Sequence, residues 1–286
     1  MTDISDLRER AKKIKLFATD LDGTLFDQKH MLRDDTCDAL LSLYKKGVVL
    51  VVATGRARSS IPDSIRSFKE IKYLITVNGA KLFINATDEL IYEKYLSIEA
   101  LDSVLHFAYD PEVMLEVFWD SIPHVELSKY NKAKEYGIPR WFSGYFFDSR
   151  TPLENFLSAI RENENKIENI NFVFGDDAVK ERVHRELLKN NDLYALTSAF
   201  SFNYEIGGVG VSKAAAVDFI AKREGILPEE IICFGDNDND VSMIEYAGIG
   251  VATGNAVPSA LHAADYITDD NENEGVAKAL KHLELI

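Results

Sequence analysis

The sequence predicts an α/β protein with a parallel β-sheet and a second domain inserted into it. Short runs rich in β-branched and aromatic residues recur along the chain, and helix-like segments lie between several of them. Near-continuous apolar strands that alternate with helices are typical of a parallel sheet covered on both faces. The alternation is clear over roughly the first 80 residues and again after Phe202. The segment between differs in composition, which predicts an interruption of the sheet domain.

The expected elements follow from this pattern, because most apolar runs end in polar or glycine-containing turns. The expected strands of the sheet are 14–19, 48–54, 73–78, 231–235, 248–252 and 266–268. The expected helices of the same domain are 36–46, 212–224 and 240–246. The middle of the chain is richer in charge and scattered aromatics, and its expected elements are helices 99–109, 153–163 and 178–190 and strands 114–119 and 170–175. We therefore expect a sheet domain formed by 1–85 and 198–286, with an α+β domain at 86–197 inserted into it.

Composition limits the partners and the location that we expect. A chain of 286 residues with 46% hydrophobic content is near the length at which one domain commonly becomes two. The net charge of −15 argues against nucleic acid or an anionic membrane as a partner. It does not exclude a small anionic substrate, because a metal ion and local cations can invert the field inside a pocket. Cys37 and Cys233 are interpreted as reduced core residues. Without a membrane span or a secretory signal in 1–13, the expected location is the cytoplasm.

The most informative motif is a pair of carboxylates, Asp20 and Asp22, at the end of the first expected strand. Carboxylates are costly to desolvate unless a cation or a reaction uses them. Acids that merely cap a strand would explain one aspartate more easily than two followed by a glycine turn. Ligands bind beyond the carboxyl ends of the strands in an open parallel sheet. Because Asp20, Thr54 and Asp236 each close a different expected strand, we expect them to converge on one cleft.

A second acidic run follows the expected strand 231–235 and holds Asp236, Asp238 and Asp240 among amides. An EF-hand loop is excluded, because valine and alanine stand where that loop needs glycine and glutamate. The N-cap of a helix could explain Asn239 or Asp240, but not the whole cluster. Together with Asp20 and Asp22, these oxygens predict a site for a hard cation, with Mg²⁺ favoured.

Two further groups could bind an anion. Lys213 follows Ser212, a predicted N-cap, so its charge lies near the positive end of the helix dipole, which is unfavourable by ~0.3–1 kcal/mol. A bound anion would reverse that sign, although an exposed lysine without a role is an open alternative. Thr54, Gly55 and Arg56 offer a hydroxyl, backbone N–H groups and a guanidinium to a phosphoryl oxygen. An ordinary strand-to-helix turn is the competing interpretation of that segment.

Other patterns give weaker signals. Asn78-Gly79 is so often a simple turn that a ligand role for it is weakly supported. Gly207–Lys213 lacks the Gly-Lys-Ser/Thr order of a nucleotide phosphate loop. The six histidines show no zinc-site spacing, and we expect most of them on the surface or in helices.

The order and content of these motifs resemble the haloacid dehalogenase superfamily. The long insert looks like the C2-type cap of its Cof-like sugar-phosphatase branch. Further segments that resemble that branch are Asn78-Gly79-Ala80, Glu205-Ile206, Ser212-Lys213 and Gly254-Asn255-Ala256. The resemblance implies a Rossmann-like catalytic core at 1–85 and 198–286 and a C2-type cap at 86–197.

The resemblance also implies a phosphatase mechanism. Asp20 would attack phosphorus and form an aspartyl-phosphate. Asp22 would protonate the leaving alcohol and then activate water, while its backbone carbonyl helps to hold the metal. Mg²⁺ would be held by Asp20, Asp22 and Asp236. Asp240 would orient Lys213 or metal-bound water. The residues expected to bind phosphate or substrate are Thr54, Gly55, Arg56, Lys213 and Asn239.

The function predicted on this basis is the hydrolysis of small phosphomonoesters, with sugar phosphates as the favoured class and a phosphorylated metabolite as the partner. The cap is expected to close over the cleft and select the leaving group. A phosphomutase of the same superfamily shares every core role and stays open. A catalytically silent binding module is the alternative from a different class.

Overall fold

The computed structural model describes residues 3–286, which form two compact units. The core unit consists of the residues up to Gly55, of Pro62–Tyr92 and of Ser212–Ile286. The inserted unit consists of Arg56–Ile61 and Glu93–Val211. The α/β class with a parallel-sheet core, predicted from the sequence, is confirmed.

The core unit is built on an eight-stranded sheet with the order β14-β13-β12-β1-β2-β3-β4-β5. Its strands are β1 (Leu16–Thr19), β2 (Val49–Ala53), β3 (Ile71–Thr76), β4 (Lys81–Ile84), β5 (Glu89–Glu93), β12 (Ile231–Gly235), β13 (Ile249–Ala252) and β14 (Tyr266–Ile267). Strands β14 to β3 pair in parallel, whereas β4 is antiparallel to β3. All residues of β1 and β12 are buried, which is why these strands are continuous apolar runs.

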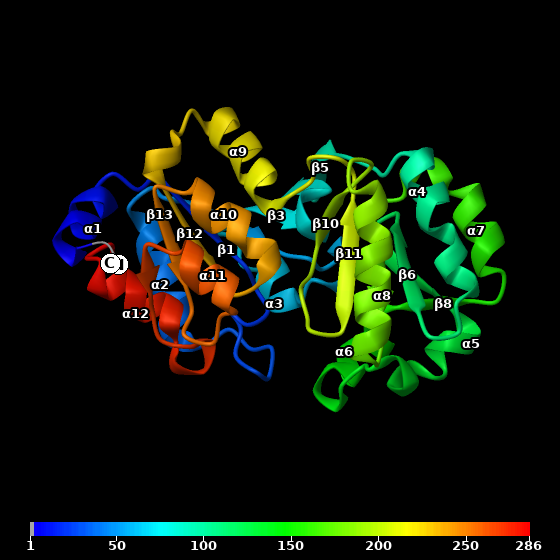
Figure 1. Cartoon of the computed structure of the whole chain (residues 1–286). Helices are drawn as coiled ribbons and strands as arrows, with labels where there is room; N and C mark the ends of the chain where they lie inside the picture. The colour runs from blue at the N-terminus through cyan, green and yellow to red at the C-terminus, as the bar shows by residue number, and fades with distance from the viewer. Residues whose placement is uncertain (1–2) are drawn as a thin grey trace. The chain divides into compact units, whose positions relative to one another are not determined.

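Helices cover both faces of this sheet (Figure 1). The helices of the core unit are α1 (Ile4–Ala11), α2 (Asp34–Lys45), α3 (Asp63–Arg66), α9 (Lys213–Glu224), α10 (Val241–Tyr246), α11 (Pro258–Ala263) and α12 (Gly275–His282). Val217 and Ile220 of α9 and Met243 of α10 join alternate strand residues such as Ala18 and Val51 in one hydrophobic core. Helix α2 packs against β2 and α12. The central strands β1 and β12 are thus buried, and it is their carboxyl ends that can present polar side chains.

The inserted unit has its own six-stranded sheet with the order β10-β11-β9-β6-β7-β8. Its strands are β6 (Met114–Trp119), β7 (Ile122–Glu126), β8 (Thr151–Leu153), β9 (Asn169–Val173), β10 (Ala195–Thr197) and β11 (Asn203–Gly207). Its helices are α4 (Ile98–Val104), α5 (Leu127–Tyr130), α6 (Arg140–Ser149), α7 (Phe156–Glu162) and α8 (Asp177–Leu187). Side chains of α4, α7 and α8 pack on one face of this sheet, and Phe142 and Phe146 of α6 pack with Met114 and Val173 on the other.

The limits of the inserted unit differ from those that the sequence suggests. The sequence places the insertion at 86–197, but the long segment of the inserted unit runs from Glu93 to Val211. Strand β5 is hydrogen-bonded into the core sheet, which moves the first crossing toward the C-terminus. The β10–β11 hairpin pairs with β9, which moves the second crossing in the same direction.

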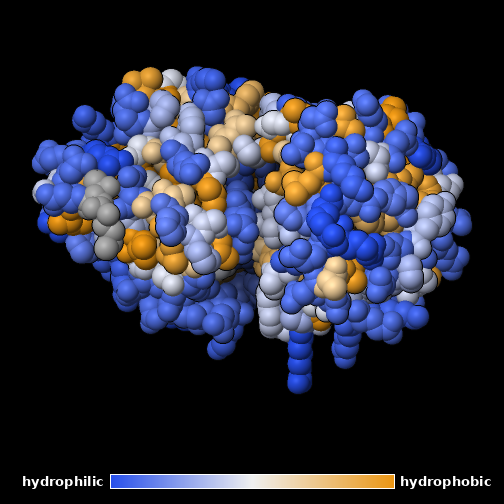
Figure 2. Space-filling view, in the orientation of Figure 1, coloured by the Kyte–Doolittle hydropathy of each residue, from blue (hydrophilic) through white to orange (hydrophobic). Residues whose placement is uncertain are grey.

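On the face shown in Figure 2, hydrophilic residues predominate and hydrophobic residues are scattered among them. Within residues 3–286, every helix is too short or too polar to cross a lipid bilayer. Both cysteines are free thiols; Cys233 is buried as expected, whereas Cys37 is only partly buried in α2.

Candidate active site

The carboxyl ends of four neighbouring strands bring polar side chains to one edge of the core sheet. Asp20 follows β1, Asp236 follows β12, Thr54 follows β2, and Asn78 follows the last residue of β3 by two positions. These strands are parallel neighbours, so their carboxyl ends lie side by side. The N–H of Asp20 donates to the carbonyl of Phe234 at 3.0 Å, which extends the β1–β12 pairing into the site. The edge of the sheet thus fixes the backbone of the first acid.

Lys213 is completely buried and lies between two carboxylates. Its Nζ is 2.8 Å from Oδ1 of Asp20 and 2.6 Å from Oδ1 of Asp240. Lys213 is the first residue of α9, and the Ser212 hydroxyl caps that helix by accepting from the N–H of Ala215. The alternative of an exposed lysine is therefore wrong, and the role of Lys213 toward phosphate stays a prediction.

The charges in this cluster alter one another's titration. Burial disfavours the charged ammonium of Lys213, but Asp20 and Asp240 outweigh burial and hold its pKa above the ordinary value. Burial raises the pKa of Asp20 to about 7, against the lowering effect of Lys213. Burial and the carboxylates of Asp240 and Asp20 likewise raise the pKa of Asp236 well above its ordinary value. One lysine does not neutralise this group of acids.

A glycine turn places the first acidic segment against the second. Gly23 has φ +85°, and a Cβ built there would lie 2.4 Å from Oδ2 of Asp236. A side chain at this position would therefore be strained by its backbone and would collide with the carboxylate. The next residue, Thr24, donates its hydroxyl to Oδ1 of Asp236 at 2.6 Å. The Gly-Thr that follows the two aspartates thus orients Asp236.

Asp240 acts as a support within the acidic run. Its Oδ2 accepts the backbone N–H groups of Asp236 and Asn237, both at 3.0 Å, while its Oδ1 contacts Lys213. Asp240 therefore holds the shape of the loop and the position of Lys213 with two different oxygens. The role expected from the sequence, that Asp240 orients Lys213 or metal-bound water, stays a prediction.

The donor set fits a divalent cation. One carboxylate oxygen from each of Asp20, Asp236 and Asp240 lies within 4.8 Å of the others, and all three residues are buried. Hard cations prefer such oxygen ligands, and a divalent charge would offset the burial and the mutual repulsion that raise the pKa values of Asp20 and Asp236. Because both oxygens of Asp240 have other partners, Asp20 and Asp236 are the better candidates for ligands.

Asn78 and Asn239 join the ends of β3 and β12. Nδ2 of Asn239 donates to Oδ1 of Asn78 at 3.0 Å, and the N–H of Asn78 donates to the carbonyl of Thr54 at 3.1 Å. Oδ1 of Asn239 is buried and has no hydrogen-bond partner among the described residues. A Cβ on Gly55 would lie 3.1 Å from Oδ1 of Asn78, so glycine permits this close approach. Asn78, weakly supported from the sequence, thus positions Asn239.

Gly79 allows the turn after β3 to pack closely against a neighbouring segment. Its φ is +104°, and a Cβ there would lie 2.3 Å from the carbonyl oxygen of Ser212. The turn after β3 therefore packs directly on the N-terminus of α9, from which Lys213 extends. A larger residue would displace the helix end.

Comparison with known proteins gives a consistent result. The sequence profile of the haloacid dehalogenase-like hydrolase family matches residues 17–280. The chain belongs to this family. It is 31% identical over 271 residues to the 5-amino-6-(5-phospho-D-ribitylamino)uracil phosphatase YcsE of Bacillus subtilis (strain 168), with 94% of this chain and 95% of the relative covered. It is 31% identical over 248 residues to the HMP-PP phosphatase of Cronobacter sakazakii, with 86% of each covered.

Solved structures agree with the fold of this hydrolase. A haloacid dehalogenase-like hydrolase from B. subtilis superposes with a TM-score of 0.82 at 27% identity, covering 94% of this chain and all of that one. The subclass IIB sugar phosphatase BT4131 superposes with a TM-score of 0.77 at 25% identity, covering 95% of this chain and 100% of the other.

Arg56 of the hydrolase has contacts within the inserted unit, to which Arg56–Ile61 belongs. Its guanidinium donates to the carbonyl of Ser60 at 3.1 Å and lies 4.3 Å from the centre of the Tyr145 ring. Its role toward phosphate therefore stays a prediction.

His30 is a site residue that the sequence analysis missed. Its Nδ1 is 3.0 Å from Oδ1 of Asp22, the second acid of the first motif. His30 lies in the loop between β1 and α2, not in a helix or on an open surface. A lone histidine without ligand spacing carries no signal in the sequence; the contact depends on how the loop folds back.

Proposed function

We propose that this hydrolase is a Mg²⁺-dependent phosphatase that cleaves small phosphomonoesters, with sugar phosphates as the favoured class, through an aspartyl-phosphate on Asp20. It is a phosphoric monoester hydrolase of the haloacid dehalogenase type, as its family and its phosphatase relatives support. The observation that carries the proposal is the buried cluster in which Lys213 contacts Asp20 while Asp20 and Asp236 lie close enough to share one cation. Such a cluster is suited to an anionic substrate.

The first chemical step is assigned to Asp20. Lys213 holds Oδ1 of Asp20, so we assign the attack on phosphorus to Oδ2. The new bond forms between this oxygen and phosphorus as the bond from phosphorus to the alcohol oxygen breaks. Mg²⁺, held by the carboxylates of Asp20 and Asp236 and the backbone carbonyl of Asp22, would offset the negative charge of the carboxylate and the phosphoryl group.

Proton transfer is assigned to Asp22, which is partly exposed. Its carboxyl group gives a proton to the departing alcohol oxygen and, as a carboxylate, later takes one from the water that attacks the aspartyl-phosphate. The second step releases inorganic phosphate and restores Asp20. In this scheme Asp240 keeps Lys213 in place, and the phosphoryl oxygens are bound by Thr54, Gly55, Lys213 and Asn239, with Arg56 on the substrate.

The two units take different parts in this proposal. The core unit supplies the chemistry, and the inserted unit is a C2-type cap that selects the leaving group. A small phosphorylated metabolite is the partner, and the cytoplasm stays the expected location.

A screen of phosphorylated metabolites with and without Mg²⁺ tests the proposal. We expect release of inorganic phosphate by the wild type only with the metal, and no release by Asp20→Asn, which lacks the nucleophile. Asp238→Asn is the matched control, because Asp238 is an exposed acid without a role in the scheme.

Three outcomes contradict it. Equal background rates in the wild type and Asp20→Asn would indicate a binding module. Conversion of a sugar phosphate to its isomer without release of phosphate would indicate a phosphomutase. Full activity in the presence of a chelator would remove the metal from the scheme.

A further inference from the structure

The contact between His30 and Asp22 has a structural basis in the loop that carries the histidine. The side chains of His30 and Asp22 are 31% and 22% exposed, so their bond at 3.0 Å is partly shielded from water. His30 has φ +57°, a left-handed conformation that is uncommon for residues other than glycine and asparagine. Such a conformation persists only where the surrounding structure determines it.

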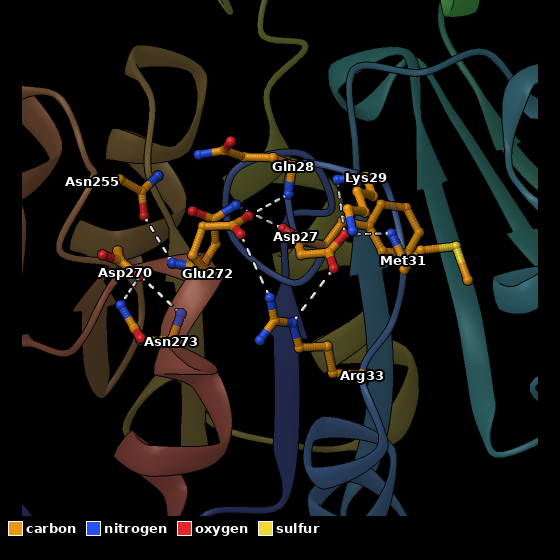
Figure 3. A network of polar contacts seen from close by, with 11 residues as sticks. Asp27, Gln28, Lys29, Met31, Arg33, Asn255, Asp270, Glu272 and Asn273 are labelled. Atoms are coloured by element: carbon orange, nitrogen blue, oxygen red, sulfur yellow. Dashed lines mark hydrogen bonds and ion pairs between the residues drawn. The ribbon is translucent and has the colours of Figure 1, made fainter. Parts of the chain in front are cut away.

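Asp27 closes this loop around the histidine. Its carbonyl accepts the N–H of His30 at 2.9 Å, and its Oδ1 accepts the N–H groups of Lys29 and Met31, both at 2.9 Å. The N–H of Asp27 in turn donates to the carbonyl of Met31 at 3.2 Å. Figure 3 shows Asp27 at the centre of these contacts. The residues on both sides of His30 are therefore fixed by one carboxylate.

A second set of contacts ties the loop to the segment before α12 (Figure 3). Arg33 lies 3.4 Å from Oδ2 of Asp27 and 3.5 Å from Oε2 of Glu272, and Oε1 of Glu272 accepts the N–H of Gln28. Asp270 braces this segment by accepting from the N–H of Asn273 at 2.8 Å. The loop is thus held by contacts with the segment before α12 as well as by its own contacts with Asp27.

Asn255 and Asn271 hold the chain between Asp22 and the loop. Nδ2 of Asn255 donates to the carbonyl of Gly23 at 2.9 Å, while its Oδ1 accepts the N–H of Asn271 at 3.1 Å. Nδ2 of Asn271 donates to the carbonyl of Phe26 at 2.8 Å. The backbone from Asp22 to the start of the loop is therefore fixed relative to the same C-terminal segment.

We propose that His30 is a positioning residue for the acid step: its Nδ1–H donates to Oδ1 of Asp22 and so makes Oδ2 the oxygen that exchanges the proton. The inference rests on the proposed function, in which Asp22 protonates the leaving group. The proton moves from Oδ2 to the alcohol oxygen as the phosphorus–oxygen bond breaks, and Oδ1 stays the acceptor of the histidine N–H. The carboxyl group of Asp22 is then held in one orientation, in which Oδ2 exchanges the proton.

The test compares two esters that differ in their need for an acid. An alkyl phosphate such as glycerol 2-phosphate requires protonation of its leaving group, whereas p-nitrophenyl phosphate releases a stable anion. We expect His30→Ala to lower the first-turnover release of glycerol from the alkyl ester by about 10- to 100-fold, less than the roughly 10²–10⁴-fold of general acid catalysis as a whole, because Asp22 itself is retained. For the first-turnover release of p-nitrophenolate we expect less than about a threefold change, because this anion leaves without a proton from Asp22, whereas the later attack of water, common to both esters, still needs Asp22. KM should be unchanged for both esters.

Two further variants separate positioning from folding. His30→Asn places an amide N–H near the position of Nδ1 and tolerates the left-handed backbone, so it should restore the alkyl ester rate to within about threefold of the wild type. Lys29→Ala is the matched control, because its exposed side chain is lost but its N–H still donates to Asp27. We expect it to match the wild type on both esters.

Other outcomes overturn the inference. Equal losses on both esters, or no loss on either, would show that the bond does not position the acid. If Asp22→Asn slowed the first-turnover release of both leaving groups equally, Asp22 would not act as the acid and His30 could not position it for that step, although phosphatase activity would stand. If the wild type cleaved neither ester with Mg²⁺, the proposed function would fall together with the inference.

Discussion

Lys213 in the core unit and Arg150 in the inserted unit are both buried cations in contact with carboxylates, but the balance of charge around them differs. Arg150 forms two parallel bonds of 3.0 Å to the carboxylate oxygens of Glu116. Asn171 completes that pair by donating to Oε2 of Glu116 at 2.8 Å. Lys213 instead contacts Asp20 and Asp240.

The pKa values express this difference. Burial disfavours the charge on Arg150, but Glu116 outweighs it and holds the pKa of the guanidinium above its ordinary value. In the core unit the pKa of the lysine is raised and the pKa of Asp20 is also raised, to about 7. In the Arg150–Glu116 pair one positive charge balances one negative charge, whereas the acids around Lys213 outnumber the single positive charge of the lysine. Buried charge of one sign in excess therefore marks a site for a cation and a reaction, and a balanced pair marks a structural contact.

Removal of the cation from each cluster tests this distinction most strongly. Lys213→Met and Arg150→Met each leave a buried carboxylate without its partner, so we expect each to lower the free energy of unfolding by about 3–5 kcal/mol. Their activities should separate. Per folded molecule, Lys213→Met should lose at least about 100-fold in kcat because an electrostatic contact to the reacting group is gone, while Arg150→Met should keep its chemical step on p-nitrophenyl phosphate.

Urea unfolding and initial rates, measured on the same preparations, check both expectations. A large loss of kcat in Arg150→Met at full folding would contradict the assignment of that pair to structure. An active Lys213→Met would contradict the assignment of the lysine to the reaction.

The sequence predicted the acidic part of the core cluster because strand ends in a parallel sheet must meet at one edge. Asp20 and Asp236 follow apolar runs that became β1 and β12 with little change in their bounds. The burial of Lys213 could not be predicted, since it depends on the turn at Gly79 packing against the N-terminus of α9. In the sequence, the position of Lys213 near the positive end of a helix dipole was only a weak indication of an anion-binding role.

Contacts between segments far apart in the chain also could not be predicted from the sequence. Nothing in the spacing of Glu116 and Arg150, which lie 34 positions apart, indicates that they pair. The sequence analysis placed β11 in the sheet domain, whereas the structure places it in the inserted unit, because β11 is a short strand whose partner, β9, lies earlier in the chain. Periodicity reports burial within one element, but it does not report which elements pack together.

Metal and pH give a second, smaller test of the excess charge. The pKa of Asp20 is about 7 in the folded protein against 3.8 as the reference, so its contribution to stability is fully present below pH 3.8. That contribution is lost as the pH rises through about 7. Without metal, we therefore expect the free energy of unfolding to fall from about pH 4 to about pH 7 and to level off above it. A metal at 100 times its Kd should add about 2.7 kcal/mol at the upper end.

Urea titrations in chelator and in Mg²⁺ across this range measure both effects. Asp20→Asn removes one titrating carboxylate and should flatten the metal-free profile, whereas Glu116→Gln, the amide replacement in the balanced pair, should leave the response to Mg²⁺ intact. A metal-free profile that rises with pH in the wild type would show that the acids are already compensated.

The smallest effect is expected when both charges of the balanced pair are removed together. Glu116→Leu combined with Arg150→Met replaces a buried ion pair with apolar side chains, which is often neutral or stabilising even where each single change costs about 3–5 kcal/mol. A deficit of about 1 kcal/mol should remain, because Asn171 loses the acceptor of its amide. Urea unfolding of the two single variants and the double variant gives the coupling between them. If the double variant lost as much free energy of unfolding as the two single variants together, Glu116 and Arg150 would not stabilise each other as a pair. The difference between this pair and the Lys213 cluster could then not be explained by charge balance alone.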